Sequence, residues 1–491
     1  MHEHPKTKKV MGKGTIYMMV TNVIFLISGY AIHFGLGRYL GPELYGTFGV
    51  IIALLYINET LLLRGMPEAV SKFTSEDEES ASSIKNKALE IQTVFSLLVF
   101  IFLVSLAPII GDKLNDSSLV KYIRLLAFIL PVAALYSIYM GHLNGVRAFG
   151  KQAKTRIVYS LTKVFAVFTL VFIGLKINGA ILGYLIAFLI GMVVAKRYCV
   201  FKTVTKSDFE ASKFVKFAVP LIIYSIGFVL LMNIDLLFVK AMVVDNAKTG
   251  FYTSATALAR TPYFIFLALS AALLPSISKS TANNDLKLTN KYINQSLRYL
   301  LLLLIPGALL VSATSKNLVS LVYTVRYINA ASSLSILIFG LTFLSVFVIL
   351  ATIITASGKP KVSMIIALML VPIDIVLNLT LIPTYELKGA ALATTITAFI
   401  GLIIAASYVF KRFGTLMSPI SFVRISGASL IIYFVAISYS FSGVLLVANY
   451  IFLFSIYLGL LWVSREINKE DIEVVKNMIP VQILNKVGFS Y

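Results

Sequence analysis

The chain has 491 residues, of which 58% are hydrophobic and only 13% are charged, and its mean hydropathy is +0.88. Soluble domains contain about 45–50% apolar residues, so this composition excludes an ordinary soluble protein and predicts a polytopic membrane protein. The net charge of +21 favours basic loops on one side of a membrane over nucleic-acid binding, because no arginine-rich arm accompanies it.

Fourteen apolar runs of about 18–25 residues follow one another along the chain, and each is long enough to cross a bilayer. We therefore expect an all-α fold with fourteen transmembrane helices. The expected spans are 14–37, 46–63, 88–110, 119–141, 157–177, 179–195, 217–239, 250–274, 292–313, 330–356, 362–382, 389–410, 422–441 and 444–464.

A repeat divides these spans into two halves. The letters YGTF at 45–48 are echoed by TGFY at 249–252, and Gly-Lys at 150–151 is echoed at 358–359. The offset stays near 204–211 residues, which is typical of transporters built from two related lobes. Six spans in each repeat return the chain to its starting side, so the lobes are expected to be parallel repeats related by a pseudo-two-fold axis along the membrane normal.

The expected organisation follows from this repeat. It comprises a basic tail (1–13), an N-lobe with six spans (14–201), a linker with an interfacial helix (202–216), a C-lobe with six spans (217–410), two further spans (411–464) and a tail (465–491). Lys and Arg are roughly three times as frequent in the alternate loops that include the N-terminus. Both termini, and with them the linker, are therefore expected on the cytoplasmic side of the plasma membrane.

Four segments resemble a known family. They are RYLGPELYG at 38–46, LNGVRAFGK at 143–151, FVKFAVPL at 214–221 and TASGKP at 355–360. The chain resembles the MOP exporter superfamily, and within it the polysaccharide-transporter branch of Wzx-type (O-antigen) flippases, related to lipid II flippases and MATE exporters. The resemblance implies alternating access between two lobes, with the headgroup of a lipid-linked oligosaccharide crossing in a central cavity.

Basic residues inside spans are candidates for headgroup binding, because an ionisable residue in a membrane usually faces a cavity or a partner. Arg260 lies midway along its span and is followed by Pro262. An arginine there would bind a diphosphate or acidic sugar, or else hold two helices together in a salt bridge. The other candidates nearer the span ends are Arg64, Lys163 and Arg298.

Acidic and polar residues of the second lobe are candidates for ion coupling. Asp235 lies in one span, Asp374 and Asn378 share one helix face because they are four residues apart, and Thr394 lies in the next span. Their oxygens would suit a hard cation such as Na⁺, and the resemblance to lipid II flippases implies a sodium site of this kind. Proton coupling and a purely structural hydrogen-bonded cluster remain open alternatives.

The expected function is outward translocation, by ion-coupled alternating access, of a lipid-linked oligosaccharide with an anionic headgroup of the polyprenyl-phosphate type. The alternative is a cation-coupled, MATE-like multidrug antiporter. An enzyme is not expected, since the sequence has no Walker motif and no metal-ligand spacing among its four histidines. The expected partners are the lipid-linked glycan substrate, membrane lipids and glycan-assembly enzymes, and nucleic acid is not expected as a partner. We expect the monomer to be the functional unit. No cofactor is expected apart from Na⁺ or H⁺ as the coupling ion.

Cavity charge separates these two expected functions. A flippase for a lipid-linked oligosaccharide with a phosphate in its headgroup needs basic side chains in the cavity, whereas an exporter of organic cations needs acidic and aromatic ones. Arg260 and Lys163 favour the flippase. The sequence therefore predicts division of labour, with basic groups for an anionic headgroup and the acidic groups of the second lobe for a driving ion.

Overall fold

The computed structural model describes residues 5–199, 209–439, 441–467 and 471, and for residues 5–16 and 264–272 it describes the backbone alone. Within these ranges every regular element is helical. The elements are α1 (Pro5–Leu63), α2 (Met66–Glu76), α3 (Ala81–Lys113), α4 (Leu119–Ala127), α5 (Ile129–Gly145), α6 (Phe149–Leu170), η1 (Val171–Leu175), α7 (Lys176–Tyr198), α8 (Ala211–Val243), α9 (Asn246–Ala259), α10 (Thr261–Ala282), α11 (Leu286–Ala313), α12 (Ser315–Val322), η2 (Val325–Ala330), α13 (Ala331–Ala356), α14 (Pro360–Phe413), α15 (Pro419–Ser438) and α16 (Val444–Val463).

Three of the long helical segments are interrupted at or close to the boundary that the sequence predicts between two spans. In α1 the interruption is Gly41, with φ 73° and ψ 172°, and Pro42 then opens the next helical stretch. The segment from α6 to α7 is interrupted at Gly174 and Lys176, and α14 is interrupted at Glu386. Backbone that leaves the helical region at these points lets the chain reverse with a very short connection.

Ten helical segments are long and apolar enough to cross a membrane, when each interrupted segment is counted once and only the described residues are considered. The expected span 250–274 takes a different form. It consists of α9 and α10, which meet at Arg260, and Pro262 lies in the first turn of α10. A proline in a first helical turn is well tolerated, but it cannot donate the hydrogen bond that would continue the preceding helix.

Residues 202–208 of the expected linker and most of the expected tail 465–491 lie outside the described residues. From Ala211 onward the expected linker belongs to α8, so this span begins earlier than the apolar run at 217 indicates. Only 465–467 and 471 of the tail are described. The helical pattern continues into the polar flank because Ser, Lys and Val side chains at 212–216 do not interrupt a helix.

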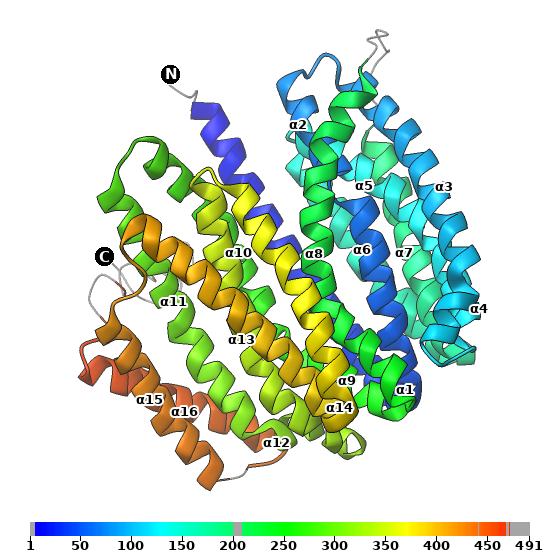
Figure 1. Ribbon diagram of the computed structural model, residues 1–491. Helices are drawn as coiled ribbons and strands as arrows, with labels where there is room; N and C mark the ends of the chain where they lie inside the picture. Colours follow the sequence, from blue (N-terminus) through cyan, green and yellow to red (C-terminus); the bar gives the residue numbers. More distant parts are fainter. Residues whose placement is uncertain (1–4, 200–208, 440, 468–470, 472–491) are drawn as a thin grey trace, which may run out of the picture.

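Two groups of helices lie side by side in Figure 1, with α2 to α7 in one group and α10 to α16 in the other. Helices α1, α8 and α9 lie where the groups meet; by their place in the sequence repeat, α1 belongs to the first group and α8 and α9 belong to the second. Helices α15 and α16 lie outermost in the second group. The far end of the bundle from the N-terminus carries the bend of α1 at Gly41, the loop between α3 and α4, and η2. We call this the Gly41 end.

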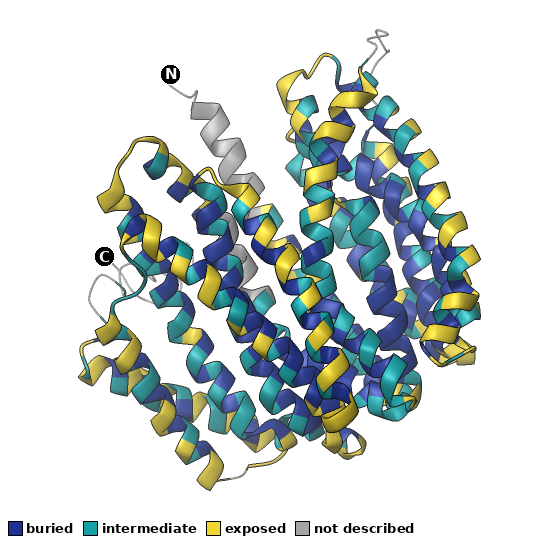
Figure 2. Cartoon of the chain, viewed as in Figure 1, coloured by how far each residue is buried: buried dark blue, intermediate teal, exposed yellow. Residues whose placement is uncertain are grey.

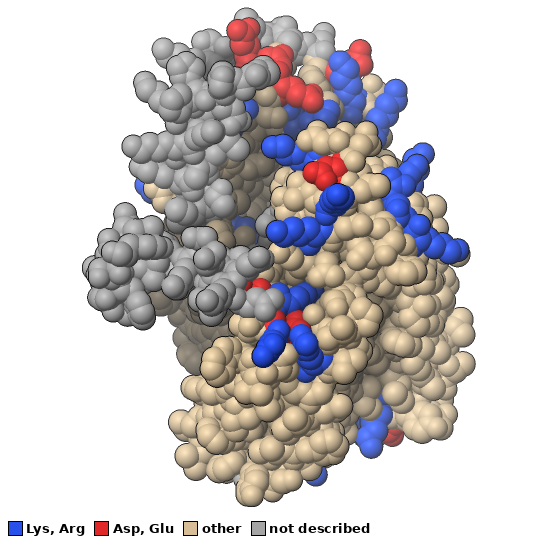
Figure 3. All heavy atoms as spheres, turned by 90° about the vertical axis from the view of Figure 1, so that its left-hand side faces the viewer, with Lys and Arg blue, Asp and Glu red and all other residues tan. Residues whose placement is uncertain are grey.

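Burial changes from the inside of the bundle to the outside in the way a membrane requires. Buried residues concentrate along the inner faces of the helices, whereas exposed residues follow their outer faces (Figure 2). Large apolar side chains are among the exposed ones, including Phe165, Phe434 and Trp462. Figure 3 shows a broad surface with few charged side chains over the lower part of one such face. Apolar surface of this extent is stable against lipid rather than water.

Candidate functional site

A cavity of about 120 Å³ lies between α1, α6, α8 and α9, where the two groups of helices meet. Two basic side chains line it, Lys163 from α6 and Arg260 from the joint between α9 and α10. The polar rings of Tyr30, His33 and Tyr56 line it from α1. Among the described residues that line this cavity none is acidic, so its wall is cationic.

Lys163 is held in a cage of aromatic rings. Its side chain is buried, and its Nζ lies 4.8 Å from the ring centre of Phe25, 5.5 Å from that of Tyr159 and 5.3 Å from that of Tyr184. Attraction between an ammonium group and an aromatic face stabilises the charge by about 0.5–2 kcal/mol per favourable contact. No carboxylate of the described residues lies within salt-bridge distance of Lys163, although the Glu59 carboxylate of α1 interacts with it electrostatically. The ammonium group therefore has no direct ion-pair partner that an anion in the cavity would have to displace.

Arg260 is held from α8. Its Nη2 donates to Asn233 Oδ1 at 3.2 Å and also to the main-chain carbonyl of Met232. Its Nε is buried and finds no acceptor among the described residues. A salt bridge was one of the two expected roles of Arg260, but the ion pairs of the described residues do not include it. The guanidinium therefore retains donors that a ligand in the cavity can use.

The other two basic candidates lie elsewhere. The Arg64 side chain is 62% exposed and lies 3.5 Å from Glu68, because it directly follows the last residue of α1. Arg298 lies 2.7 Å from Glu466 and 2.8 Å from Asp471, both in the segment after α16. Neither lines the cavity. The position of a basic residue within a predicted span therefore did not show whether it lines the cavity or pairs with an acidic residue elsewhere.

The acidic and polar candidates of the second half lie close together inside the protein. Asp235 Oδ2 accepts hydrogen bonds from Tyr252 at 2.7 Å and from Thr394 at 3.2 Å. Asp374 Oδ1 accepts one from Thr397 at 3.1 Å. All five side chains are buried. Thr394, Thr397 and Asp374 also line one small space of about 10 Å³. We call Asp235, Tyr252, Asp374, Asn378, Thr394 and Thr397 the acidic cluster.

Two oxygens of the acidic cluster remain without a hydrogen bond. Asn378 donates to the main-chain carbonyl of Asp374 at 2.8 Å, which turns its own Oδ1 away from that contact. Asn378 Oδ1 and Asp374 Oδ2 are both buried and find no partner among the described residues. A buried oxygen without a donor costs about 1–3 kcal/mol. These oxygens therefore fit a hard cation, or a proton, that satisfies them.

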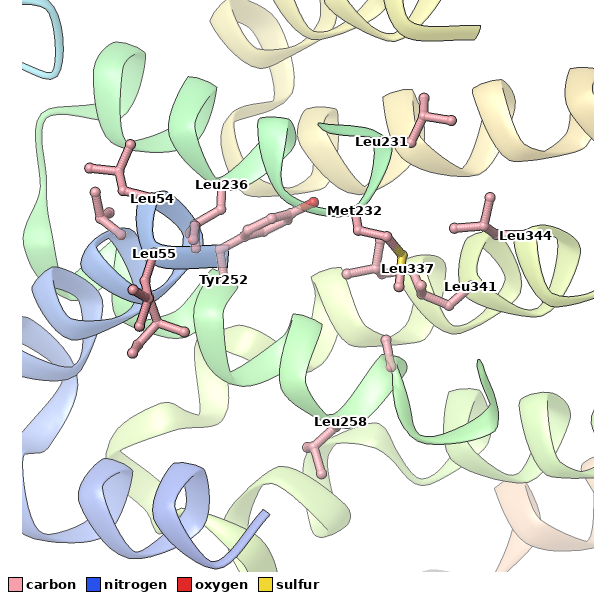
Figure 4. Close-up of a cluster of buried hydrophobic side chains, with 14 of the residues drawn as sticks. Leu54, Leu55, Leu231, Met232, Leu236, Tyr252, Leu258, Leu337, Leu341 and Leu344 are labelled. Atoms are coloured by element: carbon pink, nitrogen blue, oxygen red, sulfur yellow. The ribbon is translucent and has the colours of Figure 1, made fainter. Parts of the chain in front are cut away.

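Sequence reasoning did not identify Tyr252 and Thr397. Figure 4 shows the Tyr252 ring reaching from α9 toward α8 beside Leu236 and Met232, in an otherwise apolar layer. Tyr252 occupies the repeat position of Phe48, so a hydroxyl present in only one copy was the available signal. Thr397 follows Thr394 by three residues and shares its helix face, which was a second signal.

The two groups of helices touch backbone to backbone at the Gly41 end. A Cβ atom on Gly46 would lie 2.2 Å from the carbonyl oxygen of Asn246, and one on Gly250 would lie 1.9 Å from that of Pro42. Only glycine allows so close an approach. Gly46 and Gly250 are equivalent positions of the sequence repeat, so the repeat relates the two sides of this contact.

A buried ion pair joins the same two groups of helices. Lys240 of α8 lies 2.8 Å from Asp116, in the loop between α3 and α4, and the two side chains are 3% and 11% exposed. Lys240 also donates to Asn246, and Asn115 donates to the carbonyl of Ala241 at 2.7 Å. Burial alone would raise the pKa of Asp116, but hydrogen bonds from Lys240 and Ser118 lower it below its usual value.

Tyrosines add further contacts between the groups at this end. The hydroxyls of Tyr45 and Tyr323 lie 3.0 Å apart, and Tyr327 donates to the carbonyl of Gly37 at 2.6 Å. Arg38 donates to main-chain carbonyls of α12. The cavity is thus separated from the Gly41 end by a layer of glycine contacts, tyrosines and one ion pair.

Known proteins resemble this chain in sequence over most of its length. The family profile described as "Polysaccharide biosynthesis protein" matches residues 11–281, and the profile described as "MatE" matches residues 220–380. The lipid II flippase MurJ of Bacillus subtilis is 24% identical over 456 residues, which is 82% of this chain and 81% of that protein. The "Probable low-salt glycan biosynthesis flippase Agl15" of Haloferax volcanii is 25% identical over 376 residues, covering 76% of this chain and 78% of that protein.

Solved structures share the fold. A lipid II flippase MurJ in an inward closed conformation superposes with a TM-score of 0.76 at 18% identity, covering 92% of this chain and 99% of that one. An inward-facing MATE multidrug transporter of the MOP superfamily gives 0.66 at 14% identity, covering 82% of this chain and 98% of that one. These structures show the fold of an all-helical, multi-pass membrane protein. The family profile and the sequence relatives add that the protein is a transporter rather than an enzyme. The chain therefore belongs to the polysaccharide biosynthesis protein family, within the MOP superfamily of flippases and exporters.

Proposed function

We propose that the protein is a flippase that carries a lipid-linked oligosaccharide from the inner to the outer leaflet of the plasma membrane by alternating access. The observation that carries this proposal is that Lys163 and Arg260 line one cavity between the two groups of helices. Relatives described as flippases for lipid II and for a glycan support it.

An anionic headgroup suits the cavity. A buried arginine with free donors binds phosphate oxygens in a fixed geometry, and a buried lysine adds a point charge. Arg260 and Lys163 supply these two groups. Tyr30, His33 and Tyr56 add ring faces and polar atoms against which sugar rings can pack. A polyprenyl phosphate or diphosphate attached to an oligosaccharide has this combination of charge and sugar.

The proposed architecture has fourteen spans, since each interrupted segment and the α9–α10 pair would cross the membrane as the sequence predicts. Six spans on each side of the cavity would form two parallel lobes, followed by α15 and α16. The distribution of Lys and Arg supports cytoplasmic termini. The Gly41 end would then face outward.

Alternating access would require the lobes to separate. Pockets for drug-sized ligands occupy about 300–1,000 Å³, whereas this cavity holds about 120 Å³. A sugar diphosphate needs more room than that. The contacts at the Gly41 end support an outwardly closed state, and transport would break them so that the headgroup can leave on the outer side.

Sodium is the proposed coupling ion. Asp235, Asp374, Asn378 and Thr394 would hold it, since their oxygens match the preference of a hard cation and two of them lack a hydrogen bond. When bound, the cation would supply positive charge next to the two buried carboxylates. Without it, Tyr252, Thr394 and Thr397 stabilise the carboxylates by hydrogen bonds. A proton on Asp374 would satisfy the same oxygens and is the competing choice.

The alternative function is a cation-coupled multidrug antiporter, supported by the match to the MatE profile and by the shared fold. The cavity charge favours the flippase, because Lys163 and Arg260 would repel an organic cation.

Transport assays in proteoliposomes test the headgroup site. We expect Arg260→Ala to reduce flipping of a fluorescent polyprenyl-diphosphate oligosaccharide by roughly 10- to 150-fold, because a hydrogen bond to a charged group contributes about 1.5–3 kcal/mol. Lys163→Met should also reduce it. Arg64→Ala is the matched control, as Arg64 lies outside the cavity. Wild-type rates in both cavity variants, or faster transport of ethidium than of the glycan lipid, would contradict the proposal.

The same assay with imposed ion gradients tests coupling. Asp374→Asn removes one charge from the acidic cluster and should abolish stimulation by an inward sodium gradient while leaving expression intact. Stimulation by sodium that is equal in Asp374→Asn and wild-type protein would eliminate the sodium site. Stimulation by a proton gradient alone would select the proton.

A further inference from the structure

A single turn of α8 lies between the cavity and the acidic cluster and contributes a side chain to each. Asn233 lines the cavity, whereas Asp235, two residues later, accepts hydrogen bonds inside the acidic cluster. Residues two apart on an α-helix point about 200° away from each other. The same helical turn therefore presents an amide to the cavity and a carboxylate to the opposite side.

The Asn233 side chain has a single possible orientation. Its Nδ2 donates to the main-chain carbonyl of Val229 at 2.8 Å, which leaves Oδ1 as the acceptor for Arg260 Nη2 at 3.2 Å. Asn233 is buried, with 3% of its surface exposed. The amide thus connects the helix backbone to the guanidinium and limits the directions in which Arg260 can point.

Helices α8 and α9 are linked twice across this turn. Tyr252 of α9 donates to Asp235 of α8, and Arg260 at the end of α9 donates to Asn233 of α8. A change at Asp235 that moves either helix therefore also changes the geometry around Arg260. Interior side chains are close-packed, so such a shift is transmitted rather than absorbed.

We propose that Asn233 is a positioning residue that aims Arg260 into the cavity and links the headgroup site to the acidic cluster. This inference rests on the proposed function, because it assigns a role to Arg260 in headgroup binding. Asn233 itself need not touch the headgroup. It acts through the arginine, so its removal should affect binding only while Arg260 is present.

Binding of radiolabelled geranyl diphosphate to the purified full-length protein, in sodium and in potassium buffers, provides the test. We expect Asn233→Leu to raise the Kd at least tenfold, and Arg260→Ala to raise it similarly. The double variant should bind no more weakly than Arg260→Ala alone, since the two residues act as a unit. The ratio of the Kd values in the two buffers should differ from one in wild-type protein and approach one in Asn233→Leu.

Two further variants separate positioning from folding. Asn58→Leu is the matched control, because Asn58 also donates to the carbonyl four residues earlier but does not line the cavity. It should bind like wild-type protein. Asn233→Asp keeps an acceptor for Arg260 and adds a charge that pairs with it. We expect this variant to retain the wild-type unfolding temperature and still lose diphosphate binding, which a merely structural role would not produce.

The outcomes are distinct. Wild-type affinity in Asn233→Leu, with reduced affinity in Arg260→Ala, overturns the inference and leaves the proposed function intact. A buffer ratio that is equal in wild-type protein and Asn233→Leu overturns the link to the acidic cluster. Wild-type affinity in Arg260→Ala overturns both the inference and the proposed headgroup site.

Discussion

Removing the Asp116 carboxylate should open the Gly41 end. Asp116 and Lys240 lie 2.8 Å apart and are 11% and 3% exposed. Breaking a buried ion pair by removing one partner costs about 3–5 kcal/mol, because the other charge stays buried without compensation. Asn246 still accepts from Lys240, so we take the lower figure. About 3 kcal/mol corresponds to a roughly 150-fold shift toward the state in which Lys240 reaches water.

Thiol labelling measures this shift. Cys199 is the single cysteine and is buried, so Cys199→Ser gives a background in which Ala257→Cys, on the cavity wall, is the sole thiol. A membrane-impermeant maleimide added outside intact cells then reports how often the cavity opens outward. In this background Asp116→Asn should raise the labelling rate by up to the same factor of roughly 150.

Two variants complete the experiment. Exchanging the charges, with Asp116→Lys and Lys240→Asp together, should restore slow labelling because the pair re-forms in the opposite sense. Glu386→Gln is the matched control, since Glu386 pairs with Lys248 at an exposed position and within one group of helices. A labelling rate in Asp116→Asn equal to that of the background protein would refute the role assigned to this ion pair.

Two further predictions concern closure at the Gly41 end, and a third concerns the ion pair between Arg298 and Glu466. Gly250→Ala adds a Cβ atom 1.9 Å from a carbonyl oxygen of α1 and should raise outward labelling at least tenfold, whereas Gly427→Ala, with open space around it, should not. The lowered pKa of Asp116 means that its ion pair stabilises closure above the usual carboxyl pKa and is lost only as the pH falls through the lowered value; labelling should be constant from pH 8 to about 5 and rise in stronger acid. Glu466→Gln removes a buried carboxylate that pairs with the partly buried Arg298 of α11 and should destabilise the purified protein by about 2 kcal/mol in thermal unfolding, whereas the exposed Glu76→Gln should have no measurable effect.

Apolar runs and the repeat predicted most of the helices. Their lengths depend on bilayer thickness, which is a strong constraint on sequence. The repeat also pointed to the segments around Gly46 and Gly250, although it did not predict that these glycines touch. That contact depends on how the two copies pack against each other, and a constant offset contains no information about packing.

The candidate site was predicted in part. Asp235 and Thr394 come together as expected, because charged and polar groups in a membrane interior need partners. Arg298 and Arg64 do not join Lys163 at the cavity, because each pairs with an acidic residue elsewhere. Glu68 and Glu466 lie outside the apolar runs that contain or precede these arginines, so the runs alone did not indicate the pairing. Tyr252 was missed because a tyrosine in an apolar run reads as a core residue until its hydroxyl has a visible partner.

The central claim is that an anionic headgroup binds between Lys163 and Arg260. A cryo-electron microscopy structure of the full-length protein with a polyprenyl-diphosphate oligosaccharide tests it most directly. We predict density for the diphosphate in the cavity between α1, α6, α8 and α9, within hydrogen-bonding distance of Arg260 and close to Lys163. A diphosphate bound at the exposed Arg64 or on the lipid-facing surface, with the cavity empty of substrate, would contradict the account.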